Sequence, residues 1–169
     1  MGGEILIQKE NGMSDMSLPG RCACGAVRFR MTSRPLIVHC CHCRACQRQT
    51  GTAFALNALI ETNRVVLESG TAETVPVATP SGRGQKIVRC QECRVAVWSH
   101  YAGMGDGVSF VRVGTLEDPD ALPPDIHIFT ESKQPWVVLP DGVPAVPAYY
   151  KHDAHWPEES LTRWRARSR

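Results

Sequence analysis

Apolar and polar residues alternate along several short segments, which is the pattern of strands with one buried face. Residues 27–31 place Val27, Phe29 and Met31 on one side and two arginines on the other. Residues 53–61 alternate in the same way, and residues 64–68 are expected to form a hairpin with them. The apolar positions in phase along this second segment are Phe54, Leu56, Ala58 and Ile60.

Further short apolar runs predict more strands, separated by turns. The chain holds 14 glycines and 12 prolines, which favour many strands and turns over long helices. One or two helical turns are expected over residues 45–49, ended by Thr50 and Gly51, and residues 70–86 are expected to form an edge strand and an exposed turn. The other expected strands are residues 36–39, 86–89, 95–98 and 108–116, with 126–129 last. The predicted fold class is mainly β.

The domain organisation is predicted from these patterns and from the length of 169 residues. Residues 1–17 are expected to be a flexible leader, residues 18–150 one domain, and residues 151–169 a C-terminal tail or short basic helix. No apolar run reaches the length of a membrane span, and the first residues lack a signal-peptide pattern. We therefore expect a cytoplasmic protein that does not enter a membrane.

Cysteines are concentrated in one short stretch of the chain. Four of the eight cysteines fall within residues 40–46, and three of them, Cys41, Cys43 and Cys46, have the spacing C-x-C-x-x-C. An extended segment followed by a tight turn can bring three such thiolates to one metal ion. These three residues, called here the three-cysteine cluster, are predicted to bind zinc and to leave one coordination position open.

A second group of cysteines comes in two short pairs from distant parts of the chain. Cys22 and Cys24 form one pair, and Cys90 and Cys93 form the other, with 65 residues between Cys24 and Cys90. A metal that closes so long a loop restricts the unfolded chain, so this four-cysteine cluster is predicted to be a closed, structural zinc site. Disulfides are the alternative, which a reducing compartment disfavours.

The charge balance argues against nucleic acid as a partner. The formal net charge is +2, but seven ligand thiolates and two divalent zinc ions would change it by −3, to −1. Aromatic residues make up 7% of the chain and are not interleaved with basic residues. We expect no general attraction to phosphate backbones.

Several motifs in this order resemble the glutathione-dependent formaldehyde-activating enzyme family, whose domain is shared with centromere protein V. The resemblance covers about residues 20–149 and rests on separate segments. These segments are Gly20-Arg21-Cys22-Ala23-Cys24-Gly25-Ala26-Val27, Cys41-His42-Cys43-Arg44-Ala45-Cys46, Gly51-Thr52-Ala53-Phe54, Cys90-Gln91-Glu92-Cys93, His127-Ile128-Phe129 and Lys133-Gln134-Pro135-Trp136.

The resemblance implies a β-tent fold with two zinc ions per chain and a carbon-sulfur lyase activity. By motif position the four-cysteine cluster matches the structural zinc, and Cys41, Cys43 and Cys46 match the catalytic zinc, whereas Cys40 lies outside the pattern. The implied partners are a small thiol, glutathione or a relative, and a small aldehyde such as formaldehyde. The alternatives are a non-catalytic zinc-stapled binding module and a metal or redox sensor. A homodimer is left open.

The open site suggests a chemistry of its own. A thiol that binds zinc loses its proton, and the thiolate can then add to a carbonyl carbon. Arg44 and Arg48 flank the cluster and could attract a carboxylated thiol such as glutathione, or could simply offset thiolate charge. The alternative is a second structural zinc whose fourth ligand is Cys40, His39 or His42, although Cys40 is predicted to point away from Cys41.

The remaining candidates have ordinary structural explanations. His100 and His127 lie on or near apolar strands, where a hydrogen-bonded core histidine is the expected role. Trp136 follows a proline and is expected to fill the core. His152 and His155 are expected to lie in a solvated tail.

Overall fold

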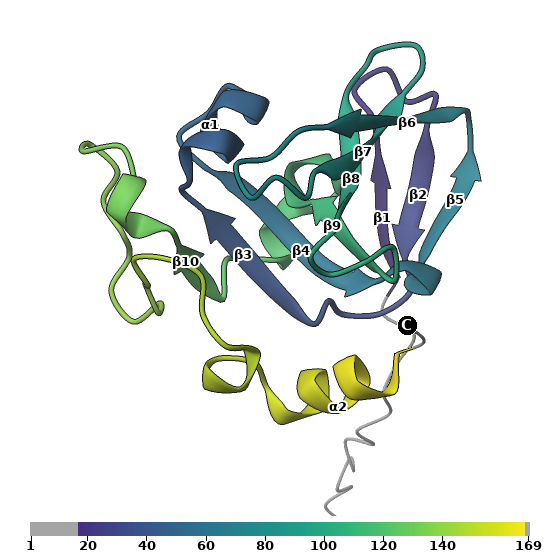
Figure 1. Cartoon of the computed structure of the whole chain (residues 1–169). Helices are drawn as coiled ribbons and strands as arrows, with labels where there is room; N and C mark the ends of the chain where they lie inside the picture. The colour runs from purple at the N-terminus through teal and green to yellow at the C-terminus, as the bar shows by residue number, and fades with distance from the viewer. Residues whose placement is uncertain (1–16, 168–169) are drawn as a thin grey trace, which may run out of the picture.

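The computed structural model describes residues 17–167. The leader expected over residues 1–17 lies outside the described residues except for its last position, as do the final two residues of the expected tail. Ten strands, two α-helices and five single 3-10 turns make up the described chain. The prediction of a mainly β protein is confirmed (Figure 1).

The strands are short and follow one another closely along the chain. They are β1 (Leu18–Arg21), β2 (Arg28–Met31), β3 (Ile37–Cys41), β4 (Ala55–Glu61), β5 (Val65–Ser69), β6 (Ala72–Val77), β7 (Gln85–Cys90), β8 (Ala96–Tyr101), β9 (Val108–Arg112) and β10 (Ile126–Ile128). The α-helices are α1 (Arg44–Thr50) and α2 (Glu158–Ala166). The 3-10 turns are Thr62–Arg64, Val113–Thr115, Pro119–Ala121, Thr130–Ser132 and His152–Ala154.

The strands form two sheets. The small sheet has the order β1-β2-β5, and the large sheet has the order β10-β3-β4-β9-β8-β7-β6. All pairings between these strands are antiparallel except that of β10 with β3, which is parallel. Two sheets with a cluster of four cysteines between their ends agree with the expected β-tent class.

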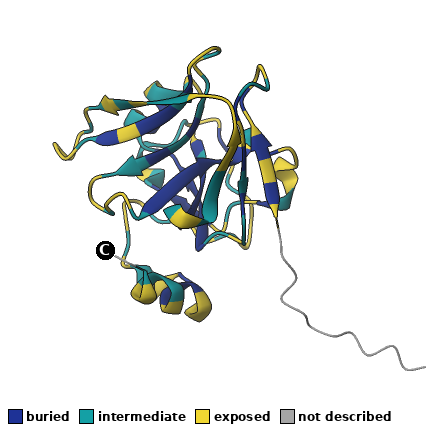
Figure 2. Ribbon diagram, turned by 90° about the vertical axis from the view of Figure 1, so that its right-hand side faces the viewer, coloured by how far each residue is buried: buried dark blue, intermediate teal, exposed yellow. Residues whose placement is uncertain are grey.

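The core has two parts, one on each face of the large sheet. One part lies between the two sheets, where Phe29 and Met31 of β2 pack with Ala58 and Ile60 of β4. The other part lies on the opposite face, under the C-terminal segment, and includes Trp156 and residues of β3, β4, β9 and β10. Figure 2 shows the buried residues concentrated in the strands and an exposed outer side on α2.

The predicted hairpin of residues 53–61 with 64–68 is wrong. Both edges of β4 are taken, one by β3 and the other by β9. The 3-10 turn at Thr62–Arg64 leads the chain out of the large sheet, so that β5 pairs with β2 instead. Alternation predicted the strands here, but it carries no information about which strands pair.

Other differences concern ends and edges. The sequence did not predict β1, whose Pro19 and Gly20 are residues that interior strands avoid and edge strands tolerate. The strand expected over 108–116 ends at Arg112 and continues as a 3-10 turn. Phe54 precedes β4 and is 39% exposed, so it is not in the core.

The C-terminal helix is attached to the large sheet by charged side chains. Arg163 of α2 donates from Nε to Glu61 Oε1 at 2.9 Å and from Nη2 to Glu61 Oε2 at 2.5 Å, and its Nη1 donates to the Arg34 carbonyl at 3.0 Å. Burial alone would raise the pKa of Glu61, but the Arg163 guanidinium lowers it overall. Within residues 17–167 no helix is long and apolar enough to cross a membrane.

Candidate metal centres and the surrounding site

The four-cysteine cluster assembles at one end of the two sheets. The Sγ atoms of Cys22, Cys24, Cys90 and Cys93 all lie within 4.8 Å of one another. Cys22 Sγ is 3.4 Å from Cys24 Sγ, which is 3.8 Å from Cys90 Sγ. Four sulfurs held tetrahedrally at about 2.3 Å from one zinc ion would be about 3.8 Å apart. The spacing therefore fits a single metal ion.

Tight turns present these sulfurs. The chain turns after β1, where the Gly25 amide donates to the Cys22 carbonyl, and after β7, where the Arg94 amide donates to the Cys90 carbonyl, both at 3.1 Å. Hydrogen bonds from the backbone amides of Cys24 and Val95 lower the pKa of Cys93 to about 6. One half of the cluster belongs to the small sheet and the other to the large sheet, so ligation would fasten the sheets together.

The three-cysteine cluster assembles from one short segment at the end of β3. The Sγ atoms of Cys41, Cys43 and Cys46 lie within 4.8 Å of one another. Cys43 is the N-cap of α1 and accepts a hydrogen bond from the Cys46 amide at 3.4 Å. Gly51 ends the same helix at a left-handed φ of 69°, as expected for the predicted stop. The local fold alone brings these three sulfurs together.

The thiols of this cluster differ in their pKa values. Hydrogen bonding from Cys41 and Cys46 lowers the pKa of Cys43, whereas the same contact with Cys43, together with burial, raises the pKa of Cys41. A metal ion would remove this competition, since it favours the thiolate form of each sulfur. The cluster has the chemistry of a metal-binding site.

Aromatic side chains surround the three-cysteine cluster. The Tyr101 hydroxyl is 3.9 Å from Cys46 Sγ, and the negative charge at Cys46 acts with burial to raise the pKa of Tyr101. Burial and the charge at Cys41 raise the pKa of Tyr149 to about 12. Tyr101 comes from β8, and Tyr149, which is 44% exposed, comes from the C-terminal segment.

His39 lies two residues before Cys41 on the same face of β3. Its Nε2 is 2.7 Å from the Tyr150 hydroxyl, which also accepts a hydrogen bond from Trp156 Nε1 at 2.9 Å. Burial lowers the pKa of His39 to about 3, so this imidazole is neutral at physiological pH. With a tyrosine as its partner, His39 joins the C-terminal segment to β3.

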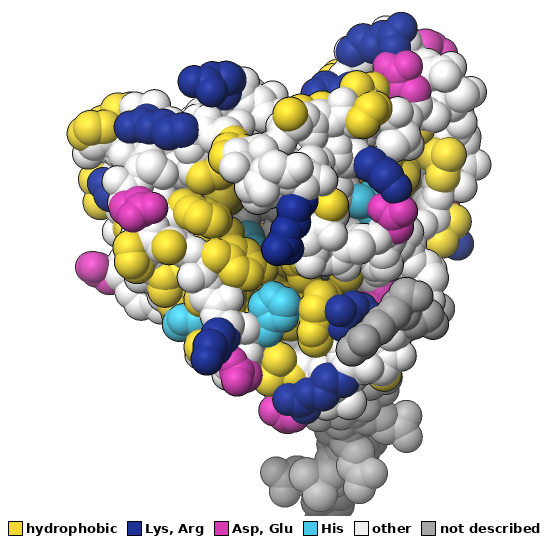
Figure 3. Space-filling view, viewed as in Figure 1, with side chains coloured by type: hydrophobic (Ala, Val, Ile, Leu, Met, Phe, Trp, Pro, Cys, Tyr) yellow, Lys and Arg dark blue, Asp and Glu magenta, His cyan; other side chains and the backbone are white. Residues whose placement is uncertain are grey.

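The two predicted arginines sit on the exposed side of α1. Arg44 donates from Nη1 to Gln47 Oε1 at 2.9 Å, and Arg48 is exposed. Gln47 is buried and donates to the carbonyls of His42 and Ser132, which fixes the segment after β10 against α1. Figure 3 shows this face, where hydrophobic side chains gather around a hollow over β3 and β10 and Lys and Arg side chains stand at its rim.

Cys40 does not belong to the three-cysteine cluster. Alternation along β3 turns it to the opposite face from Cys41, where it lies with His42 and His127. His127 is buried, as expected of a core histidine, and pairs with Cys40 in the parallel β10–β3 ladder. Residue His100 is hydrogen-bonded to the Val108 carbonyl at 3.0 Å.

Two further expectations about side chains are corrected. Trp136 is 71% exposed and is not a core residue, because it lies in residues 133–144, which form neither helix nor strand. His152 is not a solvated tail residue, since its ring stacks on Trp156 with centroids 4.4 Å apart. Both errors concern the C-terminal third, where proline-rich sequence hides the long-range contacts.

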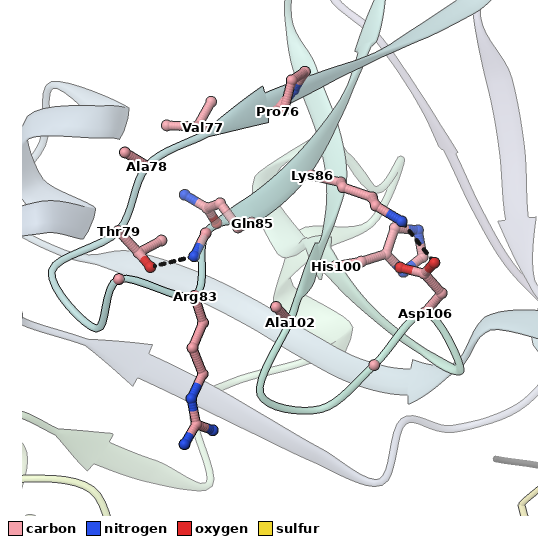
Figure 4. Close-up of a pocket in the computed structure, with 13 residues that line it drawn as sticks. Pro76, Val77, Ala78, Thr79, Arg83, Gln85, Lys86, His100, Ala102 and Asp106 are labelled. Atoms are coloured by element: carbon pink, nitrogen blue, oxygen red, sulfur yellow. Dashed lines mark hydrogen bonds and ion pairs between the residues drawn. The ribbon is translucent and has the colours of Figure 1, made fainter.

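A separate surface depression lies between β6, β7 and the loop after β8. Figure 4 shows Lys86 paired with Asp106 there, at 2.6 Å, and Arg83 pointing away from the strands. Its lining includes His100 and Gln85 but none of the eight cysteines. This depression is not a predicted site and holds no cluster of reactive groups.

The fold and the two cysteine clusters define the class of the protein: it is a mainly β protein with two clusters of cysteines that could each hold a metal ion. All eight cysteines are free of disulfides, which agrees with a role as ligands. The family model described as "Glutathione-dependent formaldehyde-activating enzyme" matches residues 17–132. The chain belongs to this family.

Two individual proteins are similar to the chain. A protein of Halomonas elongata, provisionally named a glutathione-dependent formaldehyde-activating enzyme, is 27% identical over 156 residues, which cover 90% of this chain and 96% of that protein. A crystal structure of a Rhodobacter sphaeroides protein aligns with a TM-score of 0.45 at 19% identity, and covers 62% of this chain and 94% of that one. The second likeness is too weak to support an argument.

Sequence reasoning missed most of the surroundings of the three-cysteine cluster. Strand alternation predicted correctly that Cys40 points away from Cys41, and it could also have placed His39 on the same face as Cys41, two residues away. Tyr101, Tyr149 and Tyr150 lie more than 50 residues away along the chain, and no local pattern connects them to the cluster.

Proposed function

We propose that the protein is a zinc-dependent carbon-sulfur lyase that makes and breaks the adduct between a small thiol and a small aldehyde. S-hydroxymethylglutathione, the adduct of glutathione and formaldehyde, is the proposed substrate. The forward addition joins the thiol sulfur to the aldehyde carbon, and the reverse cleavage releases both. The observation that carries this proposal is the three-cysteine cluster, which offers three sulfurs to an ion that takes four ligands.

The donor sets fit zinc in both clusters. Thiolates are preferred zinc ligands, and a closed four-thiolate set is typical of structural sites, whereas three protein ligands are typical of catalytic ones. We propose Cys22, Cys24, Cys90 and Cys93 as the structural ligands and Cys41, Cys43 and Cys46 as the catalytic ones. At the second site zinc would supply a position where an incoming thiol is held as its thiolate.

The chain's own residues would position the substrate and control water. We propose that Arg44 and Arg48 attract the carboxylates of glutathione, because both are exposed on α1, the helix that also carries Cys46. Tyr101 borders the sulfurs, and burial raises its pKa, so its protonated hydroxyl would donate to the developing oxygen of the adduct. The Tyr149 hydroxyl donates to Met104 Sδ at 3.9 Å and would form part of the rim of the site. The hydrogen bond between His39 and Tyr150 would hold the C-terminal segment beside the cluster.

The family membership supports the reaction class, and the Halomonas elongata relative carries the same activity in its name. The experiment that tests the proposal measures exchange between free glutathione and its hydroxymethyl adduct by two-dimensional NMR exchange spectroscopy. We expect the zinc-loaded protein to increase the exchange rate in proportion to its concentration.

The uncatalysed addition is rapid, so the baseline must contain matched protein. Cys46→Ser provides it, because this variant removes one ligand of the three-cysteine cluster and leaves the four-cysteine cluster intact. Equal exchange rates with the wild type and with Cys46→Ser would refute the assignment to glutathione and formaldehyde.

A further inference from the structure

Cys40, His42 and His127 form a third group of metal-ligating side chains, separate from both cysteine clusters. Their ligand atoms lie within 4.8 Å of one another. The three residues are 2%, 0% and 5% exposed, respectively. Cys40 and His127 are directly paired across β3 and β10, and His42 follows β3 by one residue. Strand pairing therefore holds the three side chains on one side of the sheet.

The distances between these side chains are close to those around one metal ion. Cys40 Sγ is 3.6 Å from His42 Nε2, which is 2.9 Å from His127 Nδ1. Two imidazole nitrogens bound at about 2.0–2.1 Å to one ion are roughly 3.3–3.6 Å apart. The sulfur–nitrogen distance already fits, and the two rings would need to separate by about half an ångström.

The histidine pair is not satisfied by its own hydrogen bond. His42 Nδ1 and His127 Nε2 are buried and have no hydrogen-bond partner among residues 17–167. When both rings are neutral, one inner nitrogen donates to the other, so one outer nitrogen carries a proton without an acceptor and the other is an acceptor without a donor. A satisfied core pair, the ordinary structural explanation, does not account for this arrangement.

We propose that Cys40, His42 and His127 bind one Cu(I) ion. Binding replaces the thiol proton of Cys40, which leaves to solvent, and no electron is transferred. The inner ring nitrogen that was the donor passes its proton to the outer nitrogen of its own ring, so that both inner nitrogens bind the ion through their lone pairs. The thiolate sulfur and two imidazoles give a three-coordinate set of soft and borderline ligands, which suits Cu(I).

Charge favours a monovalent ion at this place. One thiolate and two neutral imidazoles give a neutral complex with Cu(I) but a net charge of +1 with Zn²⁺. An unpaired charge in a site this deeply buried is unfavourable. No carboxylate in residues 17–167 is hydrogen-bonded or ion-paired with the three side chains, and the charge of Lys133 already acts on His42. A divalent ion would therefore lack its counter-charge.

The test loads the zinc-replete protein with Cu(I) without air, from a competing chelator that limits free copper. We expect the protein to bind about one Cu(I) per chain at a chelator concentration that keeps free copper too low to release zinc. Cys40→Ala should lose this copper and keep both zinc ions. His100→Gln is the matched control, since His100 is a partly buried histidine outside the group and should leave copper uptake unchanged.

A measurement on the wild type decides the proposal even if Cys40→Ala does not fold. Diffraction at the copper absorption edge should show an anomalous peak between Cys40, His42 and His127. Copper uptake that occurs only with zinc release, copper peaks confined to the two cysteine clusters, or equal uptake by folded Cys40→Ala would each overturn the proposal.

Discussion

The two cysteine clusters use the same ligand type but are assembled in different ways. The four-cysteine cluster joins turns that lie 65 residues apart, one in each sheet. The three-cysteine cluster comes from six consecutive positions at the end of β3 and the start of α1. We infer that the fold requires metal binding at the four-cysteine cluster, whereas it forms without metal at the three-cysteine cluster.

The surroundings of the clusters differ in the same sense. At the four-cysteine cluster the sulfurs interact with one another and with backbone amides. At the three-cysteine cluster the sulfurs also contact one another and a backbone amide, but the Tyr101 hydroxyl from distant β8 lies 3.9 Å from a sulfur as well. A metal site with four protein ligands needs only the turns that carry those ligands. A site with three protein ligands also needs side chains that shape a place for the substrate.

The largest effect should come from breaking the four-cysteine cluster. Cys90→Ser leaves three ligands on a site that closes a long loop, and a constraint on a loop of this length is worth about 4 kcal/mol. We expect the melting temperature to fall by about 10–15 °C, or soluble expression to be lost. Thermal melting with metal analysis measures this.

Breaking the three-cysteine cluster should have a smaller effect on stability. Cys46→Ser should remove one metal ion per chain and lower the melting temperature by less than about 5 °C, because α1 and β3 are held by backbone hydrogen bonds. If Cys46→Ser and Cys90→Ser destabilise the protein equally, the division into a structural and an open site is wrong.

The attachment of α2 to the large sheet depends on an ion pair between side chains and not on metal ligation. The Glu61 and Arg163 side chains are 9% and 17% exposed. Glu61→Gln should lower the free energy of unfolding by about 1–3 kcal/mol at pH 7. Because the folded pKa of Glu61 lies below its usual value of 4.5, this stability is present above that value and is lost as the pH falls through the folded pKa.

Chemical denaturation at pH 7 and pH 3 would check this, with the difference between wild type and variant shrinking at the lower pH. Glu158→Gln is the matched control, since Glu158 pairs with Arg165 on the exposed side of the same helix and should contribute less than about 0.5 kcal/mol. A pH-independent effect of Glu61→Gln would show that the ion pair is not its cause.

The smallest effect should be on substrate affinity at the rim. Arg48→Ala should raise the KM for the glutathione adduct about two- to fivefold and leave the melting temperature unchanged, because an exposed charge pair is worth about 0.5–1 kcal/mol. Arg28→Ala is the control, as Arg28 is an exposed arginine paired with Glu117 on the small sheet. A similar rise in KM for both variants would mean that Arg48 has no specific role.

The sequence was informative where structure is local. Alternation predicted the buried face of β2 but only one of the two buried faces of β4, and the spacing of cysteines predicted both cysteine clusters. The pairing of β5 with β2 was missed, because alternation defines the faces of a strand but not its neighbours. The exposure of Trp136 was missed because a proline-rich segment has no periodicity to analyse.

The candidate site shows the same limit. The three sulfurs follow from local spacing, but Tyr101 and Tyr149 reach them only through the order of strands and the path of the C-terminal segment. The grouping of Cys40 with His42 and His127 depends on the parallel pairing of β10 with β3, which joins residues 87 positions apart. Neither contact leaves a signal in the neighbouring residues.

The central claim is that the three-cysteine cluster accepts an external thiol and the four-cysteine cluster does not. Its most direct test is the absorption spectrum of cobalt-substituted protein, titrated with glutathione. The account predicts a stronger sulfur-to-cobalt charge-transfer band in the wild type, since one more thiolate joins the ion, and no change in Cys46→Ser. A wild-type spectrum that is unaffected by glutathione would contradict it.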